Sequence, residues 1–270
     1  MKFVIEPGRA ATDYWRDLWR YRELLAFLAW RDIAVRYKQT AIGIVWALIR
    51  PLLTLTVFVL FRRMAGLQDG EVPDVILVLA AVLPWQFFSS ALSESSTSLI
   101  GNTGLISKVY FPRLIIPLSA LATAFVDFLI TLAFLAVLMW WYGLPPDARL
   151  LALPLFTALA ALLSLGLGLL MAALTVTYRD FRYVVPFLVQ LGLFVSPVAF
   201  ASAQVPQRWR SVYALNPLAG IIDGFRWSIL GGREPLDQMF LASSVVVTAA
   251  AMIIGTWYFR RTERGFADAI

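Results

Sequence analysis

The sequence contains neither cysteine nor histidine. Without cysteine no disulfide can form, and without either side chain most zinc and haem sites are excluded, because these use thiolate or imidazole ligands. Charged residues make up only 15% of the chain, whereas a soluble domain has about 25%. The phosphate-binding motif Gly-x-x-x-x-Gly-Lys-Ser/Thr is also missing, so we expect no ATP hydrolysis by that route on this chain.

Apolar residues are abundant instead: 60% of the chain is hydrophobic and the mean hydropathy is +0.75. Two uncharged runs, 150–178 and 183–207, are each long enough to cross a hydrocarbon core, which takes about 20 helical residues. They lack the short alternating segments of an outer-membrane barrel. We therefore predict an all-α integral membrane protein. The net charge of +6 follows the membrane topology, so we expect no nucleic-acid partner.

The chain is expected to form a single transmembrane domain over residues 1–270, with six membrane-spanning helices. An amphipathic helix precedes the first span. Before the last span, the apolar pieces are too short to cross, so we expect two short helices in a re-entrant hairpin. The amphipathic helix is predicted at 13–40, the spans at 41–61, 75–100, 114–142, 150–177, 183–203 and 238–259, and the re-entrant segment at 205–232.

The distribution of basic residues predicts the orientation of these spans. Of the 23 Lys and Arg residues, 15 lie in segments on the side of the N-terminus and 7 on the opposite side. Because cytoplasmic loops carry the excess of Lys and Arg, both termini are expected in the cytoplasm. In the 13–40 helix, Trp15 and Trp19 recur at helical spacing with arginines between them, which favours a position in the membrane interface. A topology anchor alone fits the same spacing.

Two short cytoplasmic breaks, 101–113 and 177–183, both mix aromatic and charged residues. Aromatic residues and arginine are enriched at the centres of protein interfaces, so each break could be a docking element for a cytoplasmic partner. We favour docking at 177–183, where three charges separate two long apolar runs. Plain turns whose rings anchor in the membrane interface are the alternative.

Several aromatic residues lie away from the ends of the expected spans, where an aromatic belt would be found. Stacked rings suit the apolar faces of sugars, and ordinary helix packing is the alternative for any single ring. The residues are Trp46, Trp85, Phe87, Phe88, Phe125 and Phe128.

Acidic residues within the spans are few. Asp127 is the one acid deep in a span, and Glu94 lies near a span end after a serine-rich stretch. A proton-coupled pump buries several titratable groups, so one deep acid favours a helix–helix hydrogen bond instead. We expect these two acids to be isolated from each other, and no catalytic pair of carboxylates.

Five motifs, in order between about residues 31 and 232, resemble the ABC-2 type permeases. Among these, the chain looks most like the subunits that export lipid-linked polysaccharides such as O-antigen, teichoic acid or capsular polysaccharide. The motifs are Trp30-Arg31-Asp32 through Lys38-Gln39-Thr40 with Gly43, Trp46 and Pro51; Leu83-Pro84-Trp85-Gln86-Phe87-Phe88; Lys108-Val109-Tyr110-Phe111-Pro112-Arg113; Tyr178-Arg179-Asp180-Phe181-Arg182-Tyr183 with Pro186; and Leu215-Asn216-Pro217-Leu218.

This resemblance implies a non-catalytic transport subunit in the bacterial inner membrane. Such permeases form homodimers and bind two copies of a separate ATPase subunit, which holds ATP and Mg, so no cofactor is expected on this chain. The substrate would be a lipid-linked polysaccharide. The motifs imply no role for Arg50 or Asp127.

The resemblance also implies site residues. The interface helix and the two cytoplasmic breaks would couple to the ATPase, the aromatic residues named above would line a sugar channel, and the re-entrant segment would close it outside. The coupling candidates are Arg31, Asp32, Arg36, Lys108, Tyr110, Arg113, Tyr178, Arg179, Asp180, Phe181 and Arg182, and the external gate candidates are Asn216 and Pro217.

Three other functions are left open by the sequence. An ABC-2 permease for a small molecule or a lipid would have a narrow apolar cleft. An ion-coupled secondary transporter would work without an ATPase and often carries inverted repeats. A membrane-embedded transferase acting on a lipid-linked sugar would need acid or base groups at a membrane face.

Overall fold

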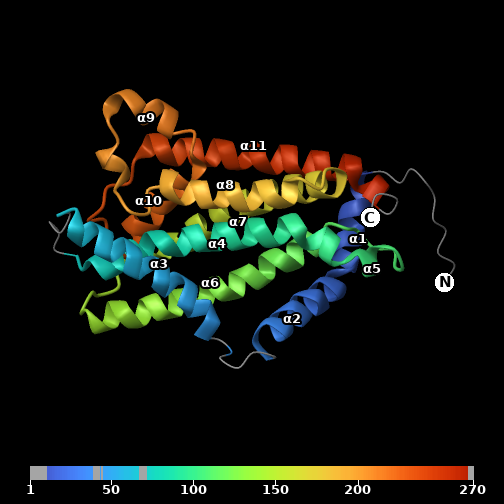
Figure 1. Ribbon diagram of the computed structural model, residues 1–270, viewed down its shortest axis with the longest axis horizontal. Coiled ribbons are helices and arrows are strands. Elements are labelled where there is room, and N and C mark those ends of the chain that lie inside the picture. The colour runs from blue at the N-terminus through green and yellow to red at the C-terminus, as the bar shows by residue number, and fades with distance from the viewer. Residues whose placement is uncertain (1–10, 39–42, 44, 67–71, 267–270) are drawn as a thin grey trace.

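The computed structural model describes residues 11–38, 43, 45–66 and 72–266, and every regular element in these residues is helical. The long helices run side by side along the longest axis of the molecule (Figure 1). In chain order, the α-helices of the described residues, long and short, are α1 (Ala11–Arg20), α2 (Arg22–Lys38), α3 (Val45–Met64), α4 (Asp74–Gly101), α5 (Thr103–Ile106), α6 (Ile115–Trp141), α7 (Leu153–Thr177), α8 (Phe181–Val195), α9 (Gln207–Tyr213), α10 (Pro217–Ile229) and α11 (Gln238–Thr262). Short 3₁₀ turns lie at Ala148–Ala152, Ser202–Gln204 and Glu263–Gly265.

Five helices in the described residues are long and apolar enough to cross a membrane: α3, α4, α6, α7 with the 3₁₀ turn before it, and α11. Their bounds lie within a few residues of the predicted spans, although residues 41, 42 and 44 of the first span lie outside the described residues. The uncharged runs therefore form helices, as their composition predicts.

The helix predicted at 183–203 is shorter than expected. α8 has 15 residues and ends at Val195, so it rises about 22 Å where a hydrocarbon core is about 30 Å thick. Its end has a local cause. Ser196 precedes Pro197, and its backbone is extended (φ −84°, ψ 153°), as is favoured before proline. The apolar run continues beyond this point, but the helix does not.

The amphipathic helix predicted at 13–40 is two helices, α1 and α2, with Tyr21 between them. Only α1 separates polar from apolar residues clearly. On α2, Phe27 and Trp30 are largely exposed while Leu28 is buried, so apolar side chains lie on both faces. Residues 39 and 40 of the prediction lie outside the described residues.

The backbones of α7 and α11 approach each other closely. A Cβ atom added to Gly255 on α11 would lie 2.0 Å from the carbonyl oxygen of Gly166 on α7, so the two backbones touch. On another face of α7, a Cβ atom on Gly168 would lie 2.7 Å from the Cβ of Ser95 on α4. These small residues allow the helices to pack closely.

The elements divide between two ends of the molecule (Figure 1). α1, α5 and the C-terminal end of α11 lie at one end, and α9 and α10 lie at the other. At that other end, α10 is buried along almost its whole length against α4, α7 and α11. The predicted re-entrant segment therefore contains two short helices, of which α10 is enclosed by protein.

Candidate functional site

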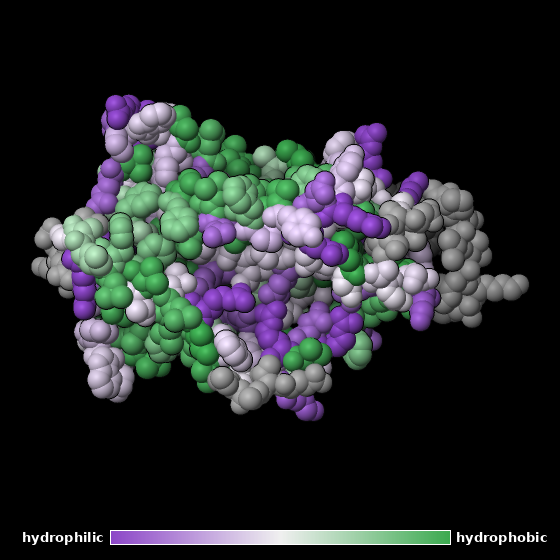
Figure 2. Space-filling view, in the orientation of Figure 1, coloured by the Kyte–Doolittle hydropathy of each residue, from purple (hydrophilic) through white to green (hydrophobic). Residues whose placement is uncertain are grey.

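A cavity of about 550 Å³ opens between α2, α3, α4 and α6. Figure 2 shows hydrophilic side chains gathered in a recess in the middle of an otherwise largely hydrophobic face. The wall combines aromatic rings, hydroxyl and amide groups, and four charged side chains. The lining residues used below are Arg36, Tyr37, Trp46, Arg50, Gln86, Phe87, Ser90, Glu94, Asp127, Phe128 and Thr131.

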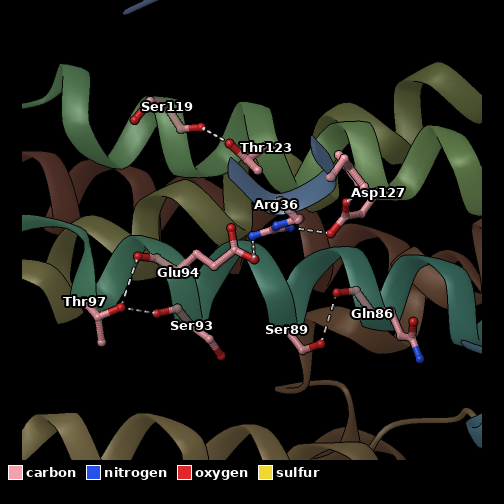
Figure 3. A network of polar contacts seen from close by, with 10 residues as sticks. Arg36, Gln86, Ser89, Ser93, Glu94, Thr97, Ser119, Thr123 and Asp127 are labelled. Atoms are coloured by element: carbon pink, nitrogen blue, oxygen red, sulfur yellow. Dashed lines mark hydrogen bonds and ion pairs between the residues drawn. The ribbon is translucent and has the colours of Figure 1, made fainter. Parts of the chain in front are cut away.

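Three charged side chains from three helices meet at this cavity (Figure 3). The guanidinium of Arg36 on α2 lies 2.8 Å from a carboxylate oxygen of Glu94 on α4 and 2.5 Å from one of Asp127 on α6. The Tyr37 hydroxyl donates to the other carboxylate oxygen of Asp127. The expectation that Glu94 and Asp127 are isolated from each other is therefore wrong, because one arginine joins them.

The aromatic residues predicted to line a channel separate into two groups. Phe87 and Phe128 border the cavity with their ring centroids 5.1 Å apart, but both rings are almost fully buried in the core. Trp46 faces the cavity from α3 with more than half of its surface exposed. Phe125 stacks on Phe128 at 5.8 Å. Trp85 and Phe88 are also buried in the core but do not border the cavity; the edge of Trp85 packs against Gly192 of α8.

Most hydroxyl groups that form hydrogen bonds in the serine-rich part of α4 donate within their own helix, whereas Ser95 donates to the carbonyl of Pro117 on α6. Ser96 donates to the carbonyl of Ser93 at 2.7 Å, and Ser98 donates to that of Ser95 at 2.7 Å. Thr97 bonds carbonyls three and four residues back (Figure 3). Such bonds let a polar stretch remain helical. Ser95 and Ser96 are buried against other helices, so part of the run lines protein rather than water.

The turn at 177–183 is the most exposed of the predicted coupling segments. Tyr178, Arg179, Asp180 and Arg182 are exposed, and Phe181 begins α8. The rings of Tyr178 and Phe181 lie 6.5 Å apart. The turn therefore presents two rings and three charges on one short element.

The other predicted coupling residues differ in their surroundings. Lys108 and Tyr110 are exposed. Arg31 bonds Asp32 beside it and donates to the side chain of Asn102, just after α4, at 2.9 Å. Arg36 differs from them in that it lies at the cavity.

Arg113 belongs to a cluster that ties both termini of the described chain to the 101–113 segment. Its backbone amide donates to a carboxylate oxygen of Glu263 at 2.9 Å. The Tyr14 hydroxyl donates to the same oxygen at 3.1 Å, and Arg260 lies 4.6 Å from the Tyr14 ring. Burial, with Glu263 beside it, raises the pKa of the Tyr14 phenol.

At the opposite end, the predicted gate residues begin α10. The Asn216 side chain caps the helix by accepting from the amide of Leu218 at 3.0 Å, and it donates to the Ser196 hydroxyl at 3.2 Å. Pro217 occupies the first helical turn, where its missing N–H is harmless. Asn216 thus joins the start of α10 to the end of α8.

Arg226 on α10 is a residue whose importance the sequence does not reveal. It is 1% exposed and donates to the carbonyls of Phe200 at 2.9 Å and Val198 at 3.0 Å. One turn earlier, Asp223 accepts from the hydroxyl of Ser202 at 2.8 Å. Both residues fix the irregular segment after α8 onto α10. The only available signal is a pair of opposite charges three residues apart within an apolar stretch.

The comparisons with known proteins agree with this architecture. The family described as "ABC-2 type transporter" matches residues 23–230. The chain belongs to the ABC-2 type transporter family. Each relative described next is similar to most of this ABC-2 chain and is itself covered over most of its own length.

An O-antigen export system permease protein RfbA of Myxococcus xanthus is 29% identical over 262 residues, 94% of this chain and 98% of the relative. A protein of the same name from Klebsiella pneumoniae is 26% identical over 250 residues, 92% and 95% of the two chains. The polysialic acid transport protein KpsM of Escherichia coli is 26% identical over 243 residues, 86% and 91%. The ABC-2 family and the apolar helices identify a multi-pass protein of the inner membrane.

Proposed function

We propose that this ABC-2 chain is the membrane-spanning subunit of an ATP-driven exporter that moves a lipid-linked polysaccharide, similar to O-antigen, out of the cytoplasm. The observation that carries the proposal is the cavity, because its wall has the chemistry that sugars require. The names of the relatives, O-antigen and polysialic acid export proteins, support the same substrate class.

The cavity offers both kinds of contact that a sugar makes. The exposed ring of Trp46 can pack on the apolar face of a pyranose, while the carboxylates of Glu94 and Asp127 accept hydrogen bonds from its hydroxyls. A volume of about 550 Å³ falls within the usual range of ligand sites, about 300–1,000 Å³. A small-molecule or lipid permease would have a narrow apolar cleft without such polar groups, so the polar wall of this cavity favours a sugar.

The assembly that we propose is a homodimer of this chain with two copies of an ABC ATPase subunit. ATP and Mg are held by the ATPase, so this chain is a non-catalytic transport subunit. The exposed turn at 177–183 supports docking, because its two rings and three charges stand free of the bundle. The end that carries α1, α5 and this turn would face the ATPase.

The topology that we propose has six spans, with α8 as a short fifth span and α9 and α10 as an external re-entrant pair. The burial of α10 against protein supports this, because backbone at membrane depth must be satisfied by protein or water. The excess of Lys and Arg on the side of the N-terminus supports cytoplasmic termini.

Co-purification and export together test this function. The tagged chain is extracted from its host in mild detergent, and the eluted proteins are identified by mass spectrometry. In parallel, surface polysaccharide is measured in a strain lacking the chain and in strains complemented with the wild type, with Asp180→Ala/Arg182→Ala, or with Arg233→Ala as an exposed control.

We expect a stoichiometric ATPase with a phosphate-binding loop in the wild-type eluate, loss of that partner from the double variant, and no change with the control. The deletion strain should lose surface polysaccharide. A chain that elutes alone and moves solute on an ion gradient in vesicles would overturn the proposal in favour of a secondary transporter. Intact surface polysaccharide in the deletion strain would overturn the substrate class.

A further inference from the structure

The cluster of Arg36, Glu94 and Asp127 joins a helix outside the five candidate spans to two helices within them. Arg36 lies in the last turn of α2, while Glu94 and Asp127 lie on α4 and α6. Figure 3 shows the guanidinium directed between the two carboxylates. The position of the end of α2 therefore depends on an arginine held by two acids from two other helices.

All three side chains keep contact with the cavity. The side chains of Arg36, Glu94 and Asp127 are 31%, 28% and 25% exposed. A partly exposed ion pair gains less from its charges than their short distance suggests, because water and other donors compete for the same oxygens. Another hydrogen-bond donor that enters the cavity can thus compete with Arg36 for the carboxylate oxygens.

The cavity wall contains the groups that would compete. Arg50 faces the cavity from α3, and Gln86 and Ser90 face it from α4. A sugar lying in the cavity beside Trp46 would bring adjacent hydroxyls to the carboxylates of Glu94 and Asp127. Two neighbouring hydroxyls can donate to the Glu94 oxygen and the Asp127 oxygen that Arg36 now bonds, while the second Asp127 oxygen keeps its bond from Tyr37.

α2 also contacts the segment that follows α4. Arg31 donates to the side chain of Asn102 at 2.9 Å, five residues before Arg36 and therefore about 7.5 Å away along the helix. A displacement at Arg36 would reach Asn102 through one rigid helix. α2 thus connects the cavity to the 101–113 segment at the end that carries α1.

We propose that Arg36 is a positioning residue in a latch that reports whether the cavity is occupied. With the cavity empty, Glu94 and Asp127 hold Arg36 and keep α2 against α4 and α6. When a saccharide occupies the cavity, its hydroxyls take over the carboxylates, Arg36 is released and α2 moves. This rests on the proposed function, since α2 signals to the ATPase only if the chain is an exporter subunit.

The test uses the purified complex of this chain and its ATPase in lipid nanodiscs. ATP hydrolysis is measured with and without the oligosaccharide released by mild acid from the surface polysaccharide of the host. For the wild type and the exposed control Arg233→Ala, we expect stimulation of about fivefold or more. For Arg36→Gln, the rate should be raised without oligosaccharide and should not respond to it, because the latch is already open.

A charge exchange separates the latch from a merely structural role. Arg36→Glu places a third acid at the cluster, whereas Arg36→Glu/Glu94→Arg restores one arginine between two acids on the same three helices. We expect the single variant to lose the response to oligosaccharide and the double variant to regain it. Thermal stability is measured alongside, because a structural role would lower stability and leave the ratio of stimulated to basal hydrolysis unchanged.

The movement of α2 can be measured on the whole chain in nanodiscs. Since the sequence has no cysteine, spin labels attach only to the introduced cysteines, and mixing labelled with excess unlabelled chain isolates the distance within one protomer. The exposed pair Val35→Cys on α2 and Leu129→Cys on α6 should give a narrow distance distribution that broadens with Arg36→Gln or with oligosaccharide. The control pair, Leu162→Cys on α7 and Val246→Cys on α11, should not change.

The outcomes distinguish the latch from the function on which it rests. If oligosaccharide stimulated Arg36→Gln as much as the wild type, and the α2–α6 distance in this variant were unchanged, the latch would be overturned and the exporter function would stand. Should Arg36→Gln fail to fold, the charge exchange decides: no recovery in a stable double variant overturns the latch. Absence of an ATPase partner for the wild type would overturn the proposed function itself.

Discussion

Two arginines away from bulk water are held in opposite ways. Arg226 is enclosed on α10 and donates to two backbone carbonyls, while Arg36 lies at the cavity between the carboxylates of Glu94 and Asp127. Carbonyls of a buried segment offer no second arrangement, whereas carboxylates beside a cavity can exchange one donor for another. The α10 end is therefore built to stay fixed, and the cavity side is built so that contacts can change.

The largest effect on stability is expected for Arg226→Leu. The change leaves the carbonyls of Val198 and Phe200 without a donor and Asp223 without a nearby cation. We expect a loss of about 3–5 kcal/mol in the free energy of unfolding. Titration of the purified chain with SDS in mixed micelles would measure it. The exposed control Arg233→Ala should change stability by less than about 0.5 kcal/mol, and an equal response of both variants would contradict the fixed role of α10.

A smaller loss is expected where α7 and α11 touch. Gly255→Ala places a methyl group against the carbonyl of Gly166, so the helices must separate, at a cost of about 1–3 kcal/mol. The matched control is Gly104→Ala on α5, where a Cβ atom meets nothing within 4 Å. The same titration compares the two. Equal stability of both variants would mean that this contact is not rigid.

Tyr14→Phe should have a moderate effect at the end that carries α1. It removes the hydrogen bond to the carboxylate of Glu263, a charged partner, and we expect a loss of about 1–2 kcal/mol. Tyr183→Phe, on a ring that is 77% exposed, is the control. Protease cleavage of α1 in nanodiscs would also increase in Tyr14→Phe alone if this bond holds α1 in place.

The smallest effect on stability, together with a large effect on export, is expected for Asp180→Ala/Arg182→Ala. Both side chains are exposed, so unfolding should change by about 0.5 kcal/mol or less. Surface polysaccharide should nevertheless be lost, because docking and not folding is affected. Together with the stability variants above, this double variant separates a surface needed for function from residues needed for the fold. Normal export in this variant would remove the docking role.

The helices were largely predictable because their cause is local. Long uncharged runs form helices, and charges or prolines limit them, so α4, α6, α7 and α11 lie close to their predicted bounds. The early end of α8 was also marked locally, by Ser196 before Pro197, but the uninterrupted apolar run hid that signal. The sequence gives no comparable sign that the amphipathic helix divides at Tyr21.

The candidate site was predictable only in part, because its contacts depend on packing. Of the rings that the sequence suggested as sugar contacts, Trp46 faces the cavity with an exposed ring, whereas Phe87, Phe128, Trp85 and Phe88 are buried in the core and only the first two of these border the cavity. Helical spacing cannot say which face of α4 meets its neighbours. The pairing of Arg36 with two acids follows from the crossing of α2 over α6, which no local pattern encodes.

The hydrogen bonds that the α4 hydroxyl groups already make determine how strongly these groups would bind a substrate that moves past them. The hydroxyls of Ser89, Thr97 and Ser98 already donate their protons to backbone carbonyls of the same helix. What they offer outward is lone pairs, which accept weakly and from a range of directions. If the proposed polysaccharide passes this face of α4, it meets acceptors at each turn but breaks no strong bond to advance. This face of α4 would then be polar enough to stay hydrated, yet it would bind each passing sugar only weakly.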